Sequence, residues 1–506
     1  MTIRLFNTLS RQKEVFIPLS DKQVKMYVCG VTVYDFCHLG HARAYIVWDV
    51  VRRYLELSGY SVTYVQNITD VDDKIIRRAQ EENTTIKELT DRFIQAYNED
   101  MAKLNIKPAD RYPKATEYIN EMIEIIQLLI EKDIAYVAGG NVYYAVQKFP
   151  SYGKLSHRTL DSMQAGASGR VENEEGKRYP FDFALWKEVR QAQHSDQDHL
   201  QEDLSNAWSS PWGKGRPGWH IECSAMAKSC LGETIDIHAG GADLQFPHHE
   251  NEIAQSEAHT GKPLANYWMH NGFVNIAGEK MSKSLKNFKT IRSVLAYYHP
   301  MAVRLFILQA HYRQPIDFTE EAMESATKSY NLIDESLRFK EDFSYFFQSD
   351  NLTEKDLAEN PYLQDFRSAM DDDFNTPVAL SVIFELAKIL KKERNIISHG
   401  GKTSLSDALI YQTWYVLNMI CSTLGIIRSN NFVSHFEPST NITGCDVTLT
   451  VSSGMTENEI MSLIEQRKQA KKEKNYKEAD RIREELKEKG IELIDLKGGE
   501  TTWKHL

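Results

Sequence analysis

A cysteine and two histidines lie close together near the N-terminus, in the segment MYVCGVTVYDFCHLGHAR at residues 26–43. The Cys29 thiol could be a nucleophile, a metal ligand or a small buried hydrophobic group. His38 and His41 follow a predicted strand and open a predicted helix, where unpaired backbone N–H groups and the helix dipole favour an anion. These histidines could therefore hydrogen-bond a phosphoryl group, and Gly40 would let it approach the backbone. Two ordinary surface or capping histidines fit the same pattern.

A second segment suited to phosphate is EKMSKSLKN, about 240 residues further along the chain. Lys280 and Lys283 offer ammonium groups, and Ser282 and Ser284 offer hydroxyls, which together could clamp a polyphosphate. Taken alone, this segment is equally a solvated basic loop. The two segments occur in the order expected for the two halves of a nucleotide-binding sheet, so together they favour a nucleotide site.

A third group of residues could bind a metal ion. Cys29, Cys223 in GWHIECSAM, and the cluster FPHHENEIAQS supply thiols, imidazoles and carboxylates. Two thiolates, one imidazole and one carboxylate form a sensible zinc set. Both His248 and His249 could share a helix face with Glu252, because residues three and four apart are neighbours on a helix. The residue pattern alone leaves that choice open, and a buried thiol beside a polar helix face is the alternative.

The elements that must position these residues form an alternating pattern. KMYVCGVTVYD predicts a buried strand ending at or soon after Gly30, residues 41–59 predict a helix, and SVTYVQNITD predicts a second strand. Such a βαβ unit is expected to be parallel and right-handed, with ligands at the carboxyl ends of its strands. ETIDIHAGGAD and the residues after it predict another strand and turn, followed by a helix that begins near Pro247.

Composition and charge limit the class of protein. Hydrophobic residues make up 42% and charged residues 26% of 506 residues, which is typical of a globular protein with several domains. The net charge of −11 argues against a surface that is basic throughout, although a local basic surface remains compatible with it. No segment resembles a membrane span or a secretory signal, and six cysteines in so long a chain favour a reducing, cytoplasmic setting.

The motifs HLGH and KMSKS resemble the two signature motifs of class I aminoacyl-tRNA synthetases, with Leu39 in place of the usual Ile. The resemblance implies that His38 and His41 stabilise the α-phosphate of ATP, that Lys280 and Lys283 hold the β- and γ-phosphates, and that Mg²⁺ accompanies ATP. The implied ATP-binding residues are His38, Gly40, His41, Gly240, Gly241, Asp243, Lys280, Met281, Ser282, Lys283 and Ser284. Asp243 could accept hydrogen bonds from ribose, or could simply cap a helix.

Within this class, the segments YVCGVTVYD, NITDVDDKI, GRPGWHIECSAM and GGADLQFPHHENEIAQS are similar to the cysteinyl-tRNA synthetases. The resemblance covers nearly the whole chain. It implies one Zn²⁺ per chain on Cys29, Cys223, His248 and Glu252. It also implies that the amino-acid pocket is lined by Gly30, Thr32, Thr69, Trp219 and His238. Zinc would distinguish cysteine from serine, because a soft thiolate ligand differs strongly from a neutral hydroxyl.

The expected fold class is α/β: a Rossmann-type parallel-sheet catalytic domain with an insertion, followed by a helical bundle and a small C-terminal domain. The predicted catalytic halves are residues 1–110 and 218–299, separated by an insertion at 111–217. The predicted regions after them are a stem-contact region at 300–335, a helical tRNA-binding bundle at 336–431 and an anticodon-binding domain at 432–506. In the last domain we expect a single charged helix over residues 457–490.

The expected partners are L-cysteine, ATP and tRNA(Cys), for a cytoplasmic monomer that does not bind a membrane. Two other functions fit parts of the sequence. One is a zinc-dependent ligase that joins cysteine to an amino-sugar, as in mycothiol biosynthesis, but the residues after about Phe432 favour the synthetase. The other is a tRNA- or metal-binding paralogue without catalysis, which the intact HLGH and KMSKS motifs disfavour. Trp503 could stack on an anticodon base or simply pack in a core.

Overall fold

The computed structural model describes residues 2–162, 176–189, 206–276, 278–280, 289–347, 352–428, 457–472, 475–488, 491–495 and 501–505. The chain forms two compact units, residues 1–435 and 436–506, and each is described by itself. Among the described residues, none of the helices combines the length and the apolar character needed to cross a membrane.

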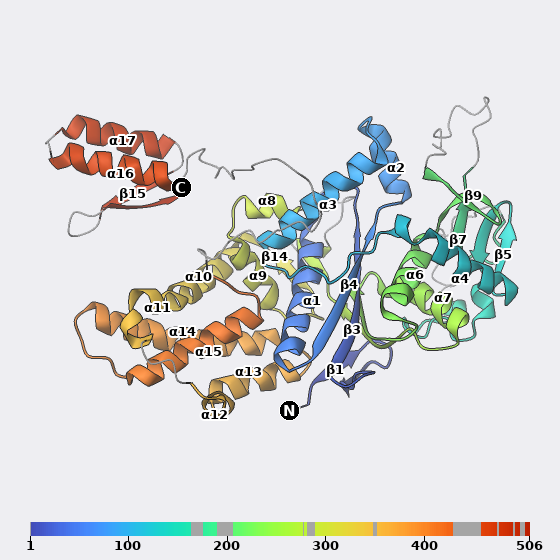
Figure 1. The fold of residues 1–506 in the computed structure, drawn as a ribbon, viewed down its shortest axis with the longest axis horizontal. Helices are drawn as coiled ribbons and strands as arrows, with labels where there is room; N and C mark the ends of the chain where they lie inside the picture. Colours follow the sequence, from blue (N-terminus) through green and yellow to red (C-terminus); the bar gives the residue numbers. More distant parts are fainter. Residues whose placement is uncertain are drawn as a thin grey trace. The chain divides into compact units, whose positions relative to one another are not determined.

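A four-stranded parallel sheet lies at the centre of the first unit, in the order β11–β10–β3–β4 (Figure 1). Its strands are β3 (Gln23–Thr32), β4 (Ser61–Thr69), β10 (Ile235–Gly241) and β11 (Ala265–Asn271). Helix α1 (Leu39–Leu57) joins β3 to β4, and α7 (Glu250–Thr260) lies between β10 and β11 in the chain. The strand order reverses between β3 and β10, which is where ligands bind in open α/β sheets.

The local sequence explains the first βαβ unit. The middle of β3, including Met26 and Val28, is buried, as expected for a strand in a parallel sheet covered on both faces. Helix α1 begins after His38, whose side chain caps it, and ends at Leu57, two residues before Gly59, which has a φ of 87°. The predicted strand–helix–strand unit is therefore confirmed.

The chain between the two halves of the sheet forms helices and a separate antiparallel sheet. The helices among its described residues include α2 (Asp73–Glu81), α3 (Ile86–Lys103), α4 (Ile119–Glu131) and α6 (Trp219–Leu231). The sheet has the order β5–β6–β7–β9–β8, with β5 (Ala135–Ala138), β6 (Asn141–Tyr144), β7 (Phe183–Glu188), β8 (Trp208–Ser210) and β9 (Gly213–Pro217). Strands β5 and β6 form a hairpin around Gly139 and Gly140, and both glycines have positive φ.

After the sheet, the first unit is mainly helical. A small three-stranded sheet combines β12 (Val274–Ile276), β13 (Glu279–Lys280) and β14 (Ile316–Phe318). The helices are α8 (Ile291–Leu295), α9 (Pro300–Leu308), α10 (Glu320–Leu337), α11 (Phe339–Asp342), α12 (Glu354–Ala358), α13 (Pro361–Asp371), α14 (Thr376–Ser398) and α15 (Asp407–Thr423). Asn375 caps α14 and Pro377 lies in its first turn, where the fixed φ of proline suits a helix start.

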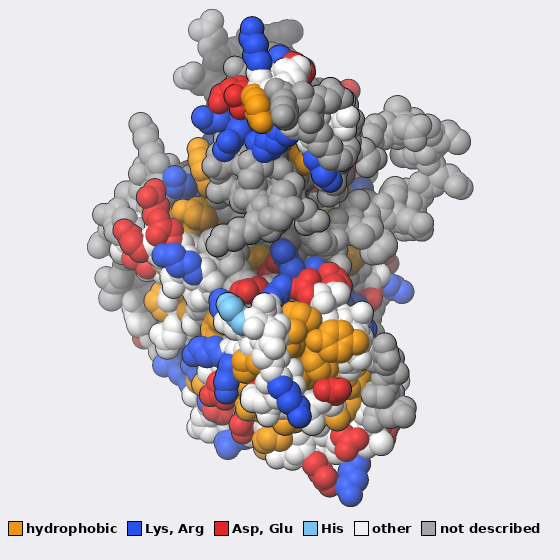
Figure 2. Space-filling model, turned by 90° about the vertical axis from the view of Figure 1, so that its left-hand side faces the viewer, with side chains coloured by type: hydrophobic (Ala, Val, Ile, Leu, Met, Phe, Trp, Pro, Cys, Tyr) orange, Lys and Arg blue, Asp and Glu red, His pale blue; other side chains and the backbone are white. Residues whose placement is uncertain are grey.

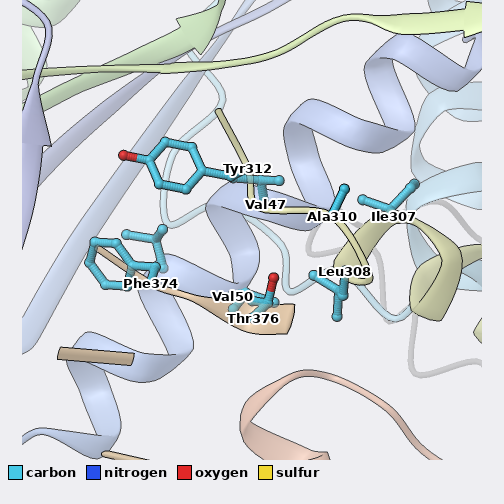
Figure 3. Close-up of a pocket in the computed structure, with 9 residues that line it drawn as sticks. Val47, Val50, Ile307, Leu308, Ala310, Tyr312, Phe374 and Thr376 are labelled. Carbon is cyan, nitrogen blue, oxygen red and sulfur yellow. The ribbon is translucent and has the colours of Figure 1, made fainter. Parts of the chain in front are cut away.

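An apolar cavity lies where α1 and α9 meet the start of α14 (Figure 3). It is lined by Val47, Val50, Val51, Ile307, Leu308, Ala310, Tyr312, Phe374 and Thr376. Its volume of about 10 Å³ is no more than one water molecule requires, and its walls offer few polar partners. The cavity is therefore a packing defect in the core and not a ligand site.

The second unit contains α16 (Glu457–Lys472), α17 (Tyr476–Glu488) and a hairpin of β15 (Ile491–Asp495) with β16 (Thr501–His505). The single charged helix expected over 457–490 is wrong, because two helices occupy this range. Asn475 begins the second helix, where its side chain accepts a hydrogen bond from the backbone N–H of Glu478. Trp503 lies opposite Leu493 in the hairpin.

Candidate metal centre and nucleotide site

Side chains from three distant segments meet at the carboxyl end of the central sheet. Cys29 comes from β3, Cys223 from α6 (Trp219–Leu231), and His248 and Glu252 from the chain around the start of α7. All four residues are buried, and their potential ligand atoms all lie within 4.8 Å of one another. The four zinc ligands expected from the family resemblance are thus brought together by the fold.

The distances within this cluster suit a zinc ion. The two Sγ atoms of Cys29 and Cys223 are 4.0 Å apart, and the Cys29 Sγ lies 3.5 Å from Oε1 of Glu252. Nε2 of His248 lies 3.0 Å from the same oxygen. Tetrahedral zinc with bonds of about 2.0–2.3 Å separates its donor atoms by roughly 3.3–3.8 Å. The cluster therefore fits a zinc site in donor chemistry and spacing.

A second, overlapping group consists of Cys29, His238, His249 and Glu252. Nε2 of His249 lies 3.3 Å from the Cys29 Sγ, so both histidines of the pair reach the cluster. The first group alone contains both thiols. In that group Glu252 presents Oε1 to His248, while its Oε2 lies 2.8 Å from Nε2 of His238. This division leaves His238 as an outer partner that orients the carboxylate.

The chain becomes helical around Pro247. A π-helical turn spans Gln245–His249 and leads directly into α7 at Glu250, and within it Phe246 has extended backbone angles. The predicted helix start near Pro247 is therefore confirmed, although its first turn is π-helical. His249 and Glu250 have right-handed helical angles, so His248 and Glu252 share one face at a spacing of four residues.

Charges in the cluster support one another. Hydrogen bonding from Cys29 lowers the pKa of the Cys223 thiol to about 6, while burial and the neighbouring Cys223 raise the pKa of Cys29. Burial opposes ionisation of Glu252, but the nearby His238 and His248 hold the pKa of this carboxyl well below its usual range. Burial would lower the pKa of His248, yet Glu252 and Cys223 raise it to about 10. Thiolate, carboxylate and neutral imidazole are the forms that bind a metal cation, so binding at this cluster would release protons from Cys29 and His248.

Further polar residues surround the cluster that the sequence did not indicate. Nδ1 of His249 lies 2.8 Å from Nε2 of His270, whose Nδ1 lies 2.8 Å from Oγ1 of Thr8. Nδ1 of His220 lies 2.9 Å from Nδ1 of His248. His270 is the next-to-last residue of β11, and a polar residue at the end of a buried strand is the signal that could have identified it.

The predicted amino-acid-binding residues lie near this cluster. Gly30 and Thr32 end β3, and Thr69 ends the neighbouring β4, where it pairs with Thr32. Trp219 opens α6, is 41% exposed and stacks on His248 with ring centroids 4.2 Å apart. His238 is fully buried between Glu252 and Trp268, so its contacts belong to the metal cluster.

The two signature histidines cap the helix reciprocally. Nδ1 of His38 accepts a hydrogen bond from the backbone N–H of His41, and Nδ1 of His41 accepts one from the backbone N–H of His38. Their rings stack with centroids 3.8 Å apart. Because a neutral imidazole has one N–H, acceptance at Nδ1 assigns the proton to Nε2 in both rings. Each ring therefore carries a donor suited to a phosphate oxygen.

The chain after KMSKS pairs directly with the HLGH segment. The backbone N–H of Leu39 donates to the carbonyl of Lys289, and the N–H of Ile291 donates to the carbonyl of Cys37. Lys280, the first residue of KMSKS, is the last residue of strand β13. Met281, Ser282, Lys283 and Ser284 lie outside the described residues. The flanks of the two motifs are thus brought together, whereas the geometry of Lys283 stays a prediction.

Buried Arg43 connects α1 to the starts of strands β12 and β14. Its guanidinium donates to the carbonyl of Phe273 at 2.7 Å, to that of Tyr312 at 3.2 Å, and to that of Gln314. Phe273 immediately precedes β12, and Gln314 precedes β14. Arg43 therefore holds α1 against the three-stranded sheet of β12, β13 and β14, whose strand β13 ends at Lys280.

The turn after β10 is more tightly packed than the sequence suggested. A Cβ on Gly240 would lie 2.9 Å from the His249 ring, and one on Gly241 would lie 2.5 Å from a carboxylate oxygen of Asp243. The exposed Asp243 is available to solvent. Close packing therefore explains why both positions hold glycine, whether or not these residues bind the nucleotide.

Comparisons with protein families identify two regions of this chain. Residues 15–328 match the tRNA synthetases class I (C) catalytic domain, and residues 365–428 match the DALR domain. A cysteine--tRNA ligase from Cyanothece sp. is 54% identical over 516 residues, and one from Trichodesmium erythraeum is 53% identical over 513. In both cases 99% of this chain and 99% of the relative are covered.

Solved structures show the same fold at low sequence identity. A Mycobacterium tuberculosis methionyl-tRNA synthetase in complex with methionyl-adenylate matches with a TM-score of 0.52 at 16% identity, covering 79% of this chain and 89% of that one. A LeuRS–tRNA–LeuAMS complex from Agrobacterium radiobacter matches with a TM-score of 0.56 at 12% identity, covering 81% and 85%. Together, the matched catalytic domain and the full-length relatives establish that this chain belongs to the cysteine--tRNA ligase family of class I aminoacyl-tRNA synthetases.

Proposed function

We propose that this chain ligates L-cysteine to tRNA(Cys) at the expense of ATP, through a cysteinyl-adenylate. The carboxylate of cysteine attacks the α-phosphorus of ATP and pyrophosphate leaves; a terminal hydroxyl of tRNA, in this class the 2′-hydroxyl, then attacks the carbonyl carbon and AMP leaves. The observation that carries the proposal is full-length identity above 50% to cysteine--tRNA ligases, together with the Cys29/Cys223/His248/Glu252 cluster in the sheet.

We propose that one zinc ion binds Cys29, Cys223, His248 and Glu252. Bound there, zinc would take the substrate's thiolate as a further ligand and so separate cysteine from serine, which a small apolar pocket distinguishes by only about 10–200-fold. No protein nucleophile is needed for the reaction, so Cys29 serves as a metal ligand. Gly30, Thr32, Thr69, Trp219 and His238 would surround the amino acid.

We propose that His38 and His41 donate from Nε2 to the α-phosphate as its negative charge grows. Lys280 and Lys283 would neutralise the β- and γ-phosphates and the departing pyrophosphate, with Mg²⁺ bound to ATP. The backbone pairing of residues 37–39 with residues 289–291 supports this arrangement, because it holds the flanks of both motifs at one end of the sheet. Gly40, Gly240, Gly241, Asp243 and the remaining residues of KMSKS would complete the nucleotide site.

We propose that the helical region at 336–431 and the predicted C-terminal domain at 432–506 bind tRNA, with the DALR match at 365–428 as support. Figure 2 shows a face of the molecule on which Lys and Arg side chains are interspersed with Asp and Glu. RNA contacts on such a surface would depend on local groups of basic residues. We further propose that the protein acts as a cytoplasmic monomer.

The two alternative functions are not favoured. A cysteine ligase acting on an amino-sugar would lack a full tRNA-binding region, whereas relatives named cysteine--tRNA ligase match 99% of this chain. A tRNA- or metal-binding paralogue without catalysis would have no need for the HLGH and KMSKS motifs, and both are intact in the sequence.

The proposed function is tested by cysteine-dependent ATP–pyrophosphate exchange and by charging of a tRNA(Cys) transcript. Lys283→Ala should reduce exchange by orders of magnitude while zinc content stays unchanged, and Lys286→Ala is the matched control because it removes a lysine just outside KMSKS. Charging of an amino-sugar but not of tRNA would favour the alternative ligase. Wild-type protein that supports no cysteine-dependent exchange would contradict the proposal.

A further inference from the structure

A bulge in strand β3 carries Cys29. Val28 pairs with Gln66 of β4, and Val31 pairs with Ile68, so Cys29 and Gly30 together oppose the single residue Asn67. An extra residue of this kind bends a strand and redirects its side chains. The metal cluster therefore depends on an irregularity in β3 that something must hold in place.

The side chain of Asn67 contacts this bulge directly. Its Oδ1 accepts a hydrogen bond of 2.7 Å from the backbone N–H of Gly30. A Cβ on Gly30 would lie 1.6 Å from the Asn67 carbonyl oxygen, so the two backbones approach as closely as only glycine permits. Since Gly30 can only donate here, this contact also fixes the orientation of the amide, with its NH₂ group turned the other way.

The NH₂ group continues the chain of hydrogen bonds toward the second thiol. Nδ2 of Asn67 lies 3.4 Å from Oγ1 of Thr69, and the Thr69 hydroxyl donates to Oε2 of Glu222 at 2.9 Å. Glu222 precedes Cys223 in the first turns of α6. Asn67, Thr69 and Glu222 are each at most 2% exposed, so water does not replace these bonds.

We propose that Asn67 is a positioning residue for cysteine recognition, because its amide joins the bulge carrying Cys29 to the helix carrying Cys223 and thereby sets the separation of the two sulfur atoms. The role in cysteine recognition rests on the proposed function, whereas the hydrogen bonds of Asn67, Thr69 and Glu222 are features of the structure itself. Asn67 contacts neither substrate nor metal; it acts through Gly30, Thr69 and Glu222.

The chain offers a matched control on the adjacent residue. Gln66 is also 2% exposed, and its amide Nε2 donates to the Tyr97 hydroxyl at 2.6 Å, away from the metal cluster. Gln66→Ala and Asn67→Ala each remove one buried, hydrogen-bonded amide from the same strand. Both should lower the free energy of unfolding, whereas only Asn67→Ala should alter the metal centre.

The experiment measures Zn²⁺ affinity of the full-length protein by competition with a chelator, and the absorption of the Co²⁺-loaded protein. Loss of an outer partner typically weakens metal binding about 10–100-fold. We expect that loss for Asn67→Ala, with a weakened thiolate-to-cobalt band, and wild-type values for Gln66→Ala. Asn67→Asp keeps the acceptor for Gly30 but not the donor for Thr69, so its affinity should fall between those of wild type and Asn67→Ala; it is the second variant should Asn67→Ala not fold.

Wild-type zinc affinity and cobalt spectrum in Asn67→Ala or Asn67→Asp would overturn the inference, as would equal losses in Gln66→Ala. Failure of the proposed function gives a different result. In that case the wild-type protein supports no cysteine-dependent pyrophosphate exchange, while the difference in metal affinity between Asn67→Ala and Gln66→Ala persists.

Discussion

The metal cluster and the nucleotide site lie at the same end of the central sheet but are built differently. Cys29, Cys223, His248 and Glu252 are at most 7% exposed and are held by side chains from separate elements. His38 and His41 are only partly buried and are held locally, by capping one helix. The potential metal ligands are buried and already dehydrated, which suits the selection of one type of atom. The hydrogen-bond donors at the N-terminus of α1 suit a large, charged ligand.

The largest expected effect removes one thiol from the cluster. Cys223→Ser should abolish stoichiometric zinc binding, a greater loss than the roughly 10–100-fold typical of an outer partner, because a hydroxyl is a poor zinc ligand. Zinc content after dialysis measures this loss. If the variant retains one zinc per chain, the proposed ligand set is wrong.

The next effect concerns the nucleotide site alone. His41→Ala removes a donor aimed at the α-phosphate and should lower kcat of pyrophosphate exchange by about 10²–10³-fold. Its zinc content should equal that of the wild-type protein. A variant that loses zinc together with activity would show that the two regions are not independent.

Arg43 tests how the nucleotide site is positioned. Arg43→Met removes the donor to the carbonyl of Gln314 and leaves those of Phe273 and Tyr312 with only their backbone donors, so the free energy of unfolding should fall by roughly 1.5–3 kcal/mol. Urea unfolding measures the loss, and the KM for ATP should rise while zinc affinity is unchanged. Unaltered stability would contradict the role assigned to this guanidinium.

The smallest expected effect is a pH dependence of the free energy of unfolding that arises from Asp100. Burial raises the pKa of Asp100 to about 6, despite its ion pair with Arg292 in α8. The folded protein thus retains a proton that the unfolded chain loses above about pH 4, so this carboxyl reduces stability as the pH rises from about 4 to 6.

Asp100→Asn removes this dependence. Relative to the variant, the wild-type free energy of unfolding should fall by roughly 1–2 kcal/mol between pH 4 and pH 7, allowing for solvent screening. Denaturant unfolding of both proteins across that range measures the difference. Parallel pH profiles would show that Asp100 is ionised throughout.

Local sequence signals predicted the elements of the sheet, but not all of the site. Strand β3 and helix α1 follow from short patterns and are confirmed. The helix start near Pro247 is also confirmed, but the spacing of His248 and Glu252 carries no signal for the π-helical form of its first turn.

The outer partners of the cluster depend on contacts that no local pattern encodes. His270 reaches His249 because β11 pairs with β10, and Asn67 supports Gly30 because a bulge shifts the pairing of β3 with β4. The charged segment in the second unit carries an Asn475 cap that predicts its division, but its uniform polarity favoured one helix. Motifs thus indicated the ligands, whereas strand pairing determined what holds them.

The central claim is that the buried cluster selects cysteine before tRNA binds. The most direct measurement is the ratio of kcat/KM for cysteine over serine in ATP–pyrophosphate exchange without tRNA, in the zinc-loaded wild-type protein and in Cys223→Ser. We predict a wild-type ratio well above the roughly 200-fold limit of an apolar pocket, and its collapse in the variant. A ratio that is the same in both proteins would contradict the account.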